Sequence, residues 1–454
     1  MKSIHTSSWY FPETSGGVEV YIDSLVQGLQ THGVGAIVAA CRHSIEEETY
    51  KHNNVPVYRY PVFANQRKIQ VHKQLPHGGF ESFANWLKNN RADVYHQHSW
   101  RFDCGLPHLA MAKKLAMATV VTVHMPEPLC LRGTMMRYGQ QICNGLIDPT
   151  DCSYCLGVPK RVPSWAMATL RLIPMNLGMA AETKVRNYKS IRLRLLGKTF
   201  SIPRQVSEHG TQLMQLVKLA DRIVVPSQWQ YDAFRLNKVP ENKLTLCRQG
   251  VAQTFPRQTV PRKPKNATLK IGFLGRWQET KGVQVLAEAL HRLPADVAVE
   301  LIIHATHPQK YGVANREKVL AIAAHDNRIH IAEPLSRQEV QGALAGFDLL
   351  AVPSQWLETG PLVVLEAQAV GIPVLGSNLG GIAELVQHGV NGWLVPPQDI
   401  QAWSSSIAHF VQNPDLIARL RQGIQPVRTM DNVASEMVQI YREITNNYPK
   451  YSAD

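Results

Sequence analysis

The sequence predicts an α/β protein built of two doubly wound domains, and three observations lead to this prediction. The chain has 454 residues, which is enough for two domains of ordinary size with their own hydrophobic cores. The pentapeptide VPSQW occurs twice, at 225–229 and 352–356, and both copies stand between an apolar strand and a predicted helix. Residues 252–268 contain three prolines and no helical periodicity, so we interpret them as the linker between the domains.

The first domain is predicted to span residues 1–252, with a cysteine-containing and basic insertion at about 125–205. It opens with a short strand at 2–6, the glycine pair Gly16-Gly17 and a helix at about 18–32. Further apolar runs predict strands at 93–100, 118–126 and 220–227. His124 ends one of these strands, and the carboxyl ends of parallel strands face the crevice of a doubly wound fold. Of His96 and His98, we expect one to line that crevice and the other to be a structural histidine with satisfied hydrogen bonds.

The second domain is predicted to span residues 266–430, with a helical segment at 431–454 after it. Its first strand, 269–276, ends in Gly275-Arg276 and meets a helix near Gly282. Further strands are predicted at 299–305, 328–334, 349–353 and 372–377. Arg276 and Lys281 lie on the loop between the first strand and its helix. Two fixed cations there can stabilise the negative charge that develops on a departing phosphate, although two basic residues in a loop are ordinary by themselves.

Residues 348–384 place two carboxylates around a turn that suits a phosphate. The apolar run 349–352 predicts a buried strand, and Glu358 lies in the loop that follows it. Thr359, Gly360, Pro361 and Leu362 then open a helix, whose first N–H groups attract an anion. Glu366 follows one to two turns into this helix.

This spacing suits a nucleotide diphosphate that carries a polyol. Glu366 can accept both hydroxyls of a ribose while the phosphates lie at the helix start, and Glu358 can reach the group on the outer phosphate. The alternative is that Glu358 caps the helix and that Glu366 is a solvated surface residue. The neighbours of Glu366 in the sequence are too apolar for a surface face, and a buried carboxylate requires a partner.

These motifs together resemble a known family. Glu358 and Glu366, followed by AVGIPVLGSNLGGIAELVQHGVNGWLVPP, resemble the donor site of a family 4 retaining glycosyltransferase of the GT-B fold. The N-terminal SSWYFPETSGGVEVYIDSLVQGLQTHG resembles the opening glycine loop and first helix of that family, and GRWQETKG matches its Arg and Lys positions. The resemblance runs from Ile4 to about Gln425 and is weakest at 125–205. It departs at Thr359-Gly360, where many members have Phe-Gly, and this departure concerns the shape of the sugar pocket.

The resemblance implies two Rossmann-like domains that face across a cleft, with residues 431–454 packed back on the first domain. The first domain would receive the acceptor and the second would bind the nucleotide-sugar. The reaction implied is metal-independent hexosyl transfer with retention, and no Asp-x-Asp pair stands at a predicted strand end to hold a divalent ion. The implied site residues are His124 and Glu358 for the sugar, Glu366 for the ribose, and Gly16, Gly17, Arg276, Lys281, Thr359, Gly360, Pro361 and Leu362 for the diphosphate.

We therefore expect a retaining glycosyltransferase of polysaccharide synthesis with a glycan or lipid-linked acceptor. UDP-hexose is the expected donor, because UDP is the commonest donor nucleotide in the family. A nucleotide-sugar epimerase on the same fold is the alternative among enzymes. A catalytically inert, membrane-associated scaffold of a glycan assembly complex is the alternative outside enzymes, and the intact set of Glu358, Glu366, Arg276 and Lys281 argues against it.

The net charge of +13 is concentrated in the first half of the chain, since residues 1–265 carry +17 and residues 266–454 carry −4. Residues 158–204 hold ten basic side chains and one acid, beside an apolar stretch with Trp165. Such segments can lie on an anionic membrane surface, or they form a core helix followed by a solvated basic helix. Without a recognised motif, nucleic-acid binding is not expected. With no spanning apolar run and no signal-peptide core, we expect a cytoplasmic protein that is peripheral on the inner membrane face.

Four of the seven cysteines, Cys130, Cys143, Cys152 and Cys155, cluster within 26 residues, the last two as Cys-x-x-Cys. They predict a structural zinc site, and free thiols are the alternative.

Overall fold

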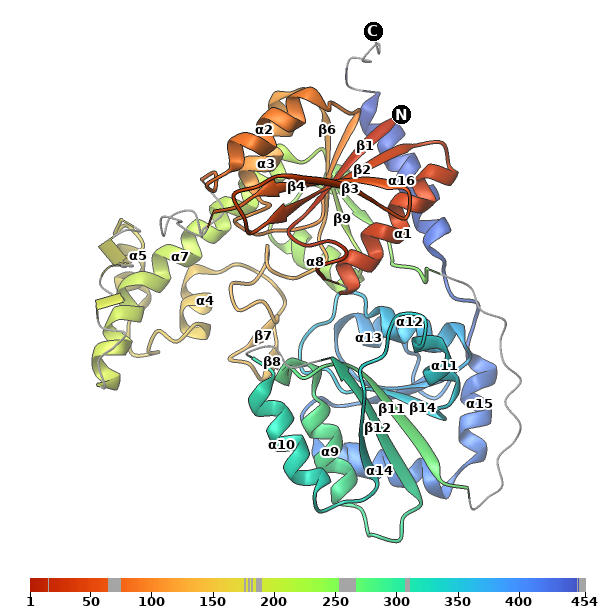
Figure 1. Ribbon diagram of the computed structural model, residues 1–454. Helices are drawn as coiled ribbons and strands as arrows, with labels where there is room; N and C mark the ends of the chain where they lie inside the picture. The colour runs from red at the N-terminus through yellow and green to blue at the C-terminus, as the bar shows by residue number, and fades with distance from the viewer. Residues whose placement is uncertain are drawn as a thin grey trace. The chain divides into compact units, whose positions relative to one another are not determined.

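The structure is a computed structural model. It describes residues 1–14, 16–63, 75–174, 177, 178, 180, 183, 184, 190–252, 267–306, 311–446 and 448. The chain divides into two compact units, Met1–Arg248 with Asp431–Asp454 as the first, and Gln249–Met430 as the second. Each unit has a mostly parallel sheet with helices packed on it (Figure 1). The predicted α/β fold with two doubly wound domains is confirmed.

The first unit is built on an eight-stranded sheet in the order β10-β9-β6-β5-β1-β2-β4-β3. Neighbouring strands are parallel except β3 and β4. Its strands are β1 (Lys2–Ser7), β2 (Gly35–Arg42), β3 (Glu48–His52), β4 (Val55–Pro61), β5 (Val94–Gln97), β6 (Ala118–Thr122), β9 (Arg222–Val225) and β10 (Leu244–Leu246). The two central strands, β5 and β1, are buried along almost their whole length, although their sequences VYHQ and KSIHTS are rich in polar residues. Buried polar side chains need hydrogen-bond partners within the fold.

The chain reverses its direction of winding between β1 and β5, because β2 lies on one side of β1 and β5 on the other. Figure 1 accordingly shows α2 and α3 on one side of the sheet and α1 and α16 on the other. In doubly wound folds, ligands bind outside the carboxyl ends of the strands at such a reversal. The helices are α1 (Gly17–Thr31), α2 (Phe80–Asn89), α3 (Leu106–Lys114), α8 (Gln228–Leu236) and α16 (Met430–Thr445), and η2 (Glu241–Lys243) is a 3-10 turn.

An insertion between β6 and β9 projects from this sheet in Figure 1, and the end of its last helix packs beside α3. It contains the hairpin β7 (Met136–Arg137) and β8 (Gln141–Ile142), then α4 (Pro149–Cys155), α5 (Ser164–Leu170) and the long α7 (Ile191–Leu219). Its own core is small, with Val158, Met167, Ile202 and Val206 as its buried residues. Among the residues that the structure describes, no helix is both long and apolar enough to cross a membrane.

The second unit has a six-stranded parallel sheet in the order β13-β12-β11-β14-β15-β16. The predicted strand at 269–276 is β11 (Leu269–Arg276), and the other predicted strands of this unit also lie in the sheet. These are β12 (Val299–Thr306), β13 (Ile329–Ala332), β14 (Leu349–Val352) and β15 (Val374–Ser377), and β16 (Gly392–Val395) completes the sheet.

Two hydrophobic cores flank this second sheet. One packs α9 (Val283–His291), α10 (Val313–Ala323) and α14 (Ile400–Gln412) against it, and the other packs α11 (Val340–Ala345), α12 (Leu362–Ala369) and α13 (Gly380–Leu385). The 3-10 turn η3 (Glu279–Lys281) precedes α9, and α15 (Asp415–Gly423) follows α14. The loops after β11 and β14, which carry the predicted site residues, therefore leave the carboxyl ends of two adjacent strands.

Candidate functional site

The strongest cluster of predicted site residues in the second unit centres on one carboxylate oxygen. Oε1 of Glu358 lies 2.6 Å from Lys281 Nζ, and it accepts hydrogen bonds from Ser354 Oγ at 2.7 Å and from Trp356 Nε1 at 2.9 Å. The Glu358 residue is 6% exposed. Three donors on one buried oxygen hold the carboxyl group in a single orientation.

Ser354 and Trp356 belong to the second VPSQW copy, so the repeat contained a signal for the site. The serine of this copy donates its hydroxyl proton to the Glu358 carboxylate.

The loop that carries Lys281 is held against the loop that carries Glu358. The Gln355 backbone N–H donates to Thr280 O at 2.7 Å. Gly282 has φ 71°, and a Cβ there would lie 1.8 Å from Pro353 O, so a side chain at this position would push the two loops apart. Gly381 N–H donates to Glu358 O at 2.7 Å and fixes the other side of the Glu358 loop. The chain thereby brings Lys281 and Glu358, 77 residues apart, into direct contact.

The predicted phosphate turn lies at the start of α12. Thr359 is buried, Pro361 has the extended backbone of a residue before a helix, and the helix begins at Leu362. Glu366 lies one turn inside α12, and burial raises the pKa of its carboxyl group while Arg337 opposes this shift. Because burial disfavours the ionised carboxylate, hydrogen-bond donors supplied by a ligand would stabilise Glu366 in its ionised form.

Two further residues of the second unit are relevant to the candidate site, and one of them contacts this turn. Arg276 is exposed at the end of β11, and within the described residues no hydrogen bond or ion pair joins it to another side chain. Gln249 was not predicted, yet it lies against the turn, since a Cβ on Gly360 would be 3.1 Å from its Cδ. The Gln249 side chain is 8% exposed, and its Oε1 has no hydrogen-bond partner among the described residues. A lone glutamine has no recognisable sequence signal for such a role.

In the first unit, the predicted glycine loop opens α1, with Gly16 at the residue before the helix and Gly17 as its first residue. The buried carboxylate of Glu19 folds back over this start. Its Oε1 accepts from Thr14 Oγ1 at 3.1 Å, and its Oε2 would lie 2.7 Å from a Cβ on Gly16. The position of this carboxylate favours glycine at residue 16 for steric reasons.

His124 follows β6 and is buried in a cluster of histidines. Its Nε2 lies 3.0 Å from His98 Nδ1, and His98 Nε2 lies 3.0 Å from His5 Nδ1. The rings of His96 and His98 are 4.1 Å apart, because residues two apart in an extended chain point to the same side. His96 has separate partners, Tyr441 Oη at 2.5 Å and Thr122 Oγ1 at 2.7 Å. The hydrogen bond to Tyr441 ties α16 to the first sheet.

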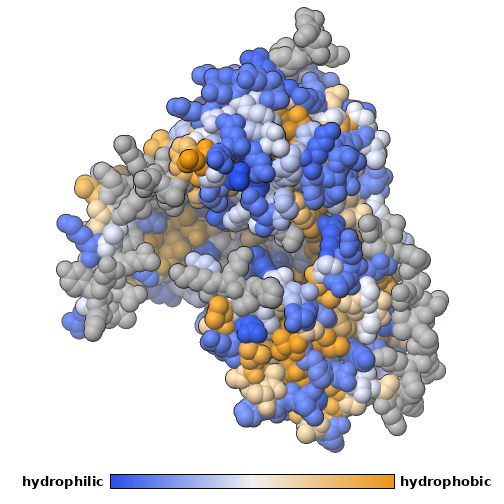
Figure 2. Space-filling model, viewed as in Figure 1, coloured by the Kyte–Doolittle hydropathy of each residue, from blue (hydrophilic) through white to orange (hydrophobic). Residues whose placement is uncertain are grey.

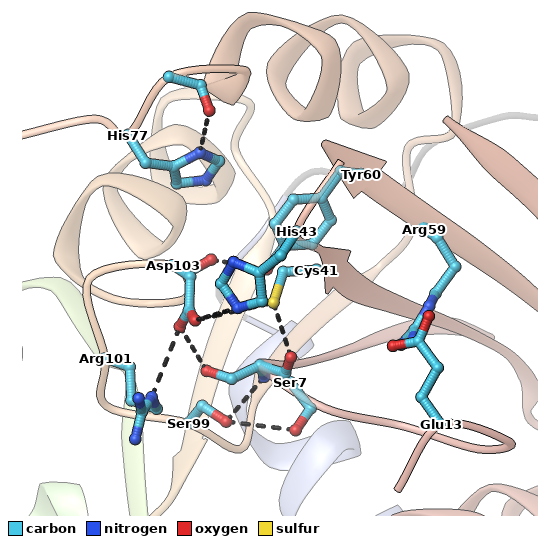
Figure 3. A network of polar contacts seen from close by, with 12 residues as sticks. Ser7, Glu13, Cys41, His43, Arg59, Tyr60, His77, Ser99, Arg101 and Asp103 are labelled. Atoms are coloured by element: carbon cyan, nitrogen blue, oxygen red, sulfur yellow. Dashed lines mark hydrogen bonds and ion pairs between the residues drawn. The ribbon is translucent and has the colours of Figure 1, made fainter. Parts of the chain in front are cut away.

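A second polar network of the first unit surrounds Asp103, which follows β5 (Figure 3). Its buried carboxylate accepts from Ser8 Oγ at 2.6 Å, and Cys41 Sγ, His43 Nε2 and Arg101 Nε lie 3.7 to 3.9 Å from it. Burial, followed by the charge of Asp103, raises the pKa of the Cys41 thiol, which donates to Ser8 O at 2.7 Å. The network lies where β1, β2 and β5 end, at the edge where doubly wound folds bind ligands.

The four predicted zinc ligands lie in the insertion. Cys152 and Cys155 are one turn apart on α4, and Cys143 directly follows β8. Burial raises the pKa of Cys152 to about 12, and the thiols of Cys143, Cys130 and Cys155 act in the same direction. Within the described residues, the groups of three possible ligands whose atoms lie within 4.8 Å of one another are His5/His96/His98 and Cys41/His43/Asp103, and neither includes these cysteines.

The arrangement in the second unit defines a class of protein. A doubly wound sheet with a Lys–Glu pair beside a helix start and a second glutamate in that helix is suited to a nucleotide diphosphate with a polyol attached. The sequence family described as glycosyl transferases group 1 matches residues 268–413, and the one described as glycosyltransferase family 4 matches residues 15–149. The chain belongs to the family 4 glycosyltransferases of the GT-B fold.

Curated relatives match parts of this chain. It is 30% identical to the D-inositol 3-phosphate glycosyltransferase of Xylanimonas cellulosilytica over 255 residues, which cover 52% of this chain and 60% of the relative. It is also 30% identical to WcaL of Escherichia coli, whose name assigns it to colanic acid biosynthesis, over 46% of this chain and 52% of the relative. The chain spans about half of the length of the curated relatives it matches.

Solved structures share the fold over almost the whole chain. Sucrose-phosphate synthase of Thermosynechococcus elongatus is 17% identical, with a TM-score of 0.66 over 98% of this chain and 99% of that chain. HepE of Anabaena, solved in complex with UDP and glucose, is 15% identical, with a TM-score of 0.61 over 97% of this chain and 99% of that chain. At these identities the likeness concerns the fold alone.

Proposed function

We propose that this protein is a retaining hexosyltransferase that moves a sugar from a nucleotide diphosphate, UDP being the expected nucleotide, to a glycan or lipid-linked acceptor. The observation that carries the proposal is the Lys281–Glu358 pair beside the α12 turn, with the buried Glu366 one turn further on. HepE of Anabaena, which shares the fold, was solved with UDP and glucose, and UDP is therefore the first nucleotide to test.

The proposed chemistry is electrostatic. As the bond between sugar and diphosphate breaks, negative charge grows on the outer phosphate, and Lys281, Arg276 and the N–H groups at the start of α12 stabilise that charge. When the donor binds, Lys281 turns from Glu358 towards the phosphate. Ser354 and Trp356 keep the Glu358 carboxylate in place, where it accepts hydrogen bonds from sugar hydroxyls. The leaving phosphate takes the proton of the acceptor hydroxyl on the same face of the sugar, which gives retention. His124 also contacts the transferred sugar.

Two substitutions separate these roles. Glu366→Ala should weaken UDP binding about 10- to 100-fold, because two charge-assisted hydrogen bonds to the ribose are lost. Glu358→Ala should leave UDP affinity within about threefold and lower sugar transfer about 100-fold or more. Glu317→Gln, an exposed acid on α10, is the matched control. Calorimetry with UDP, GDP and ADP measures the first effect, and unchanged UDP affinity in folded Glu366→Ala would refute the ribose assignment.

The alternatives give different products. Radiolabelled nucleotide sugars incubated with membrane extract should yield a glycosylated product. Release of an altered free sugar would favour a nucleotide-sugar epimerase, and no turnover of any nucleotide sugar would favour the inert scaffold.

We also propose that Cys130, Cys143, Cys152 and Cys155 hold a structural zinc ion. Two observations support this zinc site. Cys152 and Cys155 lie one turn apart on α4, and the Tyr138 N–H in the β7–β8 turn donates a hydrogen bond to Cys155 Sγ at 3.3 Å. The β7–β8 hairpin has two short strands, and the small core of the insertion contains no described residue of it, so a metal link to α4 would stabilise the hairpin. Purified protein should carry about one equivalent of zinc, lost in Cys152→Ser with UDP affinity unchanged. Protein prepared without chelator that contains no metal would leave the thiols free.

Membrane association of the insertion is the third proposal. Trp165 and Leu172 are 72% and 75% exposed, and basic side chains lie near them in the sequence; Figure 2 shows orange and blue atoms close together on this part of the molecule. The basic residues Arg186 and Lys189 lie outside the described residues. Each cation near an anionic surface contributes about 1 kcal/mol.

A charge-deleted variant tests this proposal. Replacing three exposed arginines of the insertion by Gln should lower binding to phosphatidylserine vesicles about 100-fold at low salt, and salt should have the same effect on the wild type. The control removes three exposed cations elsewhere. Equal vesicle binding by both variants would favour a soluble acceptor. The variants are Arg161/Arg171/Arg192→Gln and, as control, Lys88/Arg292/Arg419→Gln.

A further inference from the structure

A continuous chain of imidazole rings leads from the first strand of the protein to His124. Ser3 Oγ lies 3.1 Å from His5 Nε2, His5 Nδ1 lies 3.0 Å from His98 Nε2, and His98 Nδ1 lies 3.0 Å from His124 Nε2. All three histidines are at least 95% buried. We propose that His5 and His98 are positioning residues that fix both the orientation and the tautomer of His124. The inference rests on the proposed function, in which His124 contacts the transferred sugar.

The hydrogen-bond chain permits two proton arrangements. A neutral imidazole has one N–H donor and one bare nitrogen, so each ring must donate on one side and accept on the other. If Ser3 accepts from His5 Nε2–H, each of the three rings carries its proton on Nε2, and Nδ1 of His124 is bare. If Ser3 donates instead, every ring is reversed and Nδ1 of His124 carries a proton. The tautomer of His124 is therefore coupled to a hydroxyl on another strand.

Ser3 decides between the two arrangements. Its hydroxyl also lies 3.3 Å from Gly35 O, a carbonyl that can only accept. When Ser3 donates its proton to Gly35 O, it accepts from His5 Nε2–H. The geometry therefore assigns the proton of His124 to Nε2 and makes Nδ1 a hydrogen-bond acceptor. A fixed acceptor favours a sugar group that donates a proton, such as a hydroxyl, over a carboxylate.

Burial keeps the rings neutral, as this arrangement requires. It lowers the pKa of His5 and of His124 to about 3 and the pKa of His98 well below its ordinary value. His96 lies in the same cluster but outside the chain, because Tyr441 and Thr122 occupy its two nitrogens. His96 therefore offers a matched control at a neighbouring, equally buried position.

A metal ion is the competing interpretation of the cluster, since ligand nitrogens of His5, His96 and His98 lie within 4.8 Å of one another. A metal would require bare nitrogens on all three rings. The 3.0 Å separation of His5 Nδ1 and His98 Nε2 fits a shared proton, whereas His96 would have to give up one of its two hydrogen bonds. The hydrogen-bonded chain satisfies these nitrogens without an ion.

Nitrogen NMR of protein labelled with ¹⁵N-histidine tests the proposal without a substitution, because bare and protonated ring nitrogens resonate far apart. The His124 signals are assigned by their loss in His124→Gln. We expect a protonated Nε2 and a bare Nδ1 in the wild type, with couplings across the His5–His98 and His98–His124 hydrogen bonds. A proton on Nδ1, a charged ring at neutral pH, or a bound metal with these residues as ligands would overturn the proposal.

Substitutions then connect the tautomer to turnover. His98→Leu should give His124 a mixture of tautomers and lower kcat/KM for transfer about tenfold, which is the effect of one weakened hydrogen bond. His98→Gln, which can accept from His124 and donate to His5, should recover kcat/KM to within about threefold. His96→Leu should leave the His124 spectrum unchanged.

Unchanged spectra and unchanged kcat/KM in folded His98→Leu would overturn the proposal. Absence of transfer by the wild type would instead refute the proposed function, and the NMR result would be unaffected.

Discussion

Lowering the pH from 7.5 to 5.5 should destabilise the first unit sharply, because five of its histidines are buried as neutral rings. Burial lowers the pKa of each of these rings, to about 3 for two of them and well below the ordinary value for the others. In the unfolded chain each ring has a pKa of about 6.5 and takes up a proton as the pH falls. Stability is therefore fully present above about pH 6.5 and is lost below it. The five are His5, His96, His98, His108 and His124.

The size of the effect follows from proton linkage. Between pH 7.5 and 5.5, each histidine that stays neutral in the native state and titrates in the unfolded state removes about 1.4 kcal/mol from the free energy of unfolding. Five such residues remove about 7 kcal/mol, which is comparable with the whole stability of an ordinary domain.

Hydrogen exchange followed by mass spectrometry measures this effect for each unit separately. Peptides from β1, β5 and β6 report on the first unit, and peptides from β11 and β12 report on the second. The opening free energy at β1, β5 and β6 should fall by several kcal/mol between pH 7.5 and 5.5, after correction for the intrinsic exchange rate. His108→Gln should reduce the pH slope by about one proton. A loss below about 1 kcal/mol would refute the conclusion that these rings are neutral and buried.

Three further predictions concern single interactions. Gly282→Ala should lower the free energy of unfolding of the second unit by about 1–3 kcal/mol, since its Cβ would collide with Pro353 O; an unchanged urea midpoint would contradict this. Asp326→Asn should lower the free energy of unfolding by about 2 kcal/mol at pH 7 in the same assay, because the hydrogen bond from Arg328 lowers the pKa of Asp326 to about 2. The difference in stability between this variant and the wild type should vanish as the pH falls from 4 to 2. Tyr441→Phe should cost about 1–2 kcal/mol by leaving His96 Nδ1 without its hydrogen bond, and faster hydrogen exchange in α16 would report it.

The sequence by itself determined the fold class, and it predicted the residues proposed for the phosphate side of the candidate site. Continuous apolar runs predict buried parallel strands because both faces of such a strand are covered, and the structure places β11, β12, β14 and β15 where these runs lie. The carboxylates Glu358 and Glu366 were predicted because their spacing along one loop and one helix is a local property. Local patterns of this kind depend on backbone geometry, so they can be read from the sequence without knowledge of distant contacts.

The tertiary structure alone decided which distant residues meet. The contact between Lys281 and Glu358 joins the loops that follow two adjacent strands, β11 and β14, and these loops are 77 residues apart in sequence. The Asp103 network joins the ends of three strands. The chain from Ser3 through His5 and His98 to His124 has no sequence signature. Ser3 and His5 lie in β1, whereas His98 and His124 follow β5 and β6, and the parallel register of these three strands brings the rings together. Sequence periodicity shows which face a residue occupies within its own strand, whereas hydrogen-bond partners across strands are set by the order and register of the sheet.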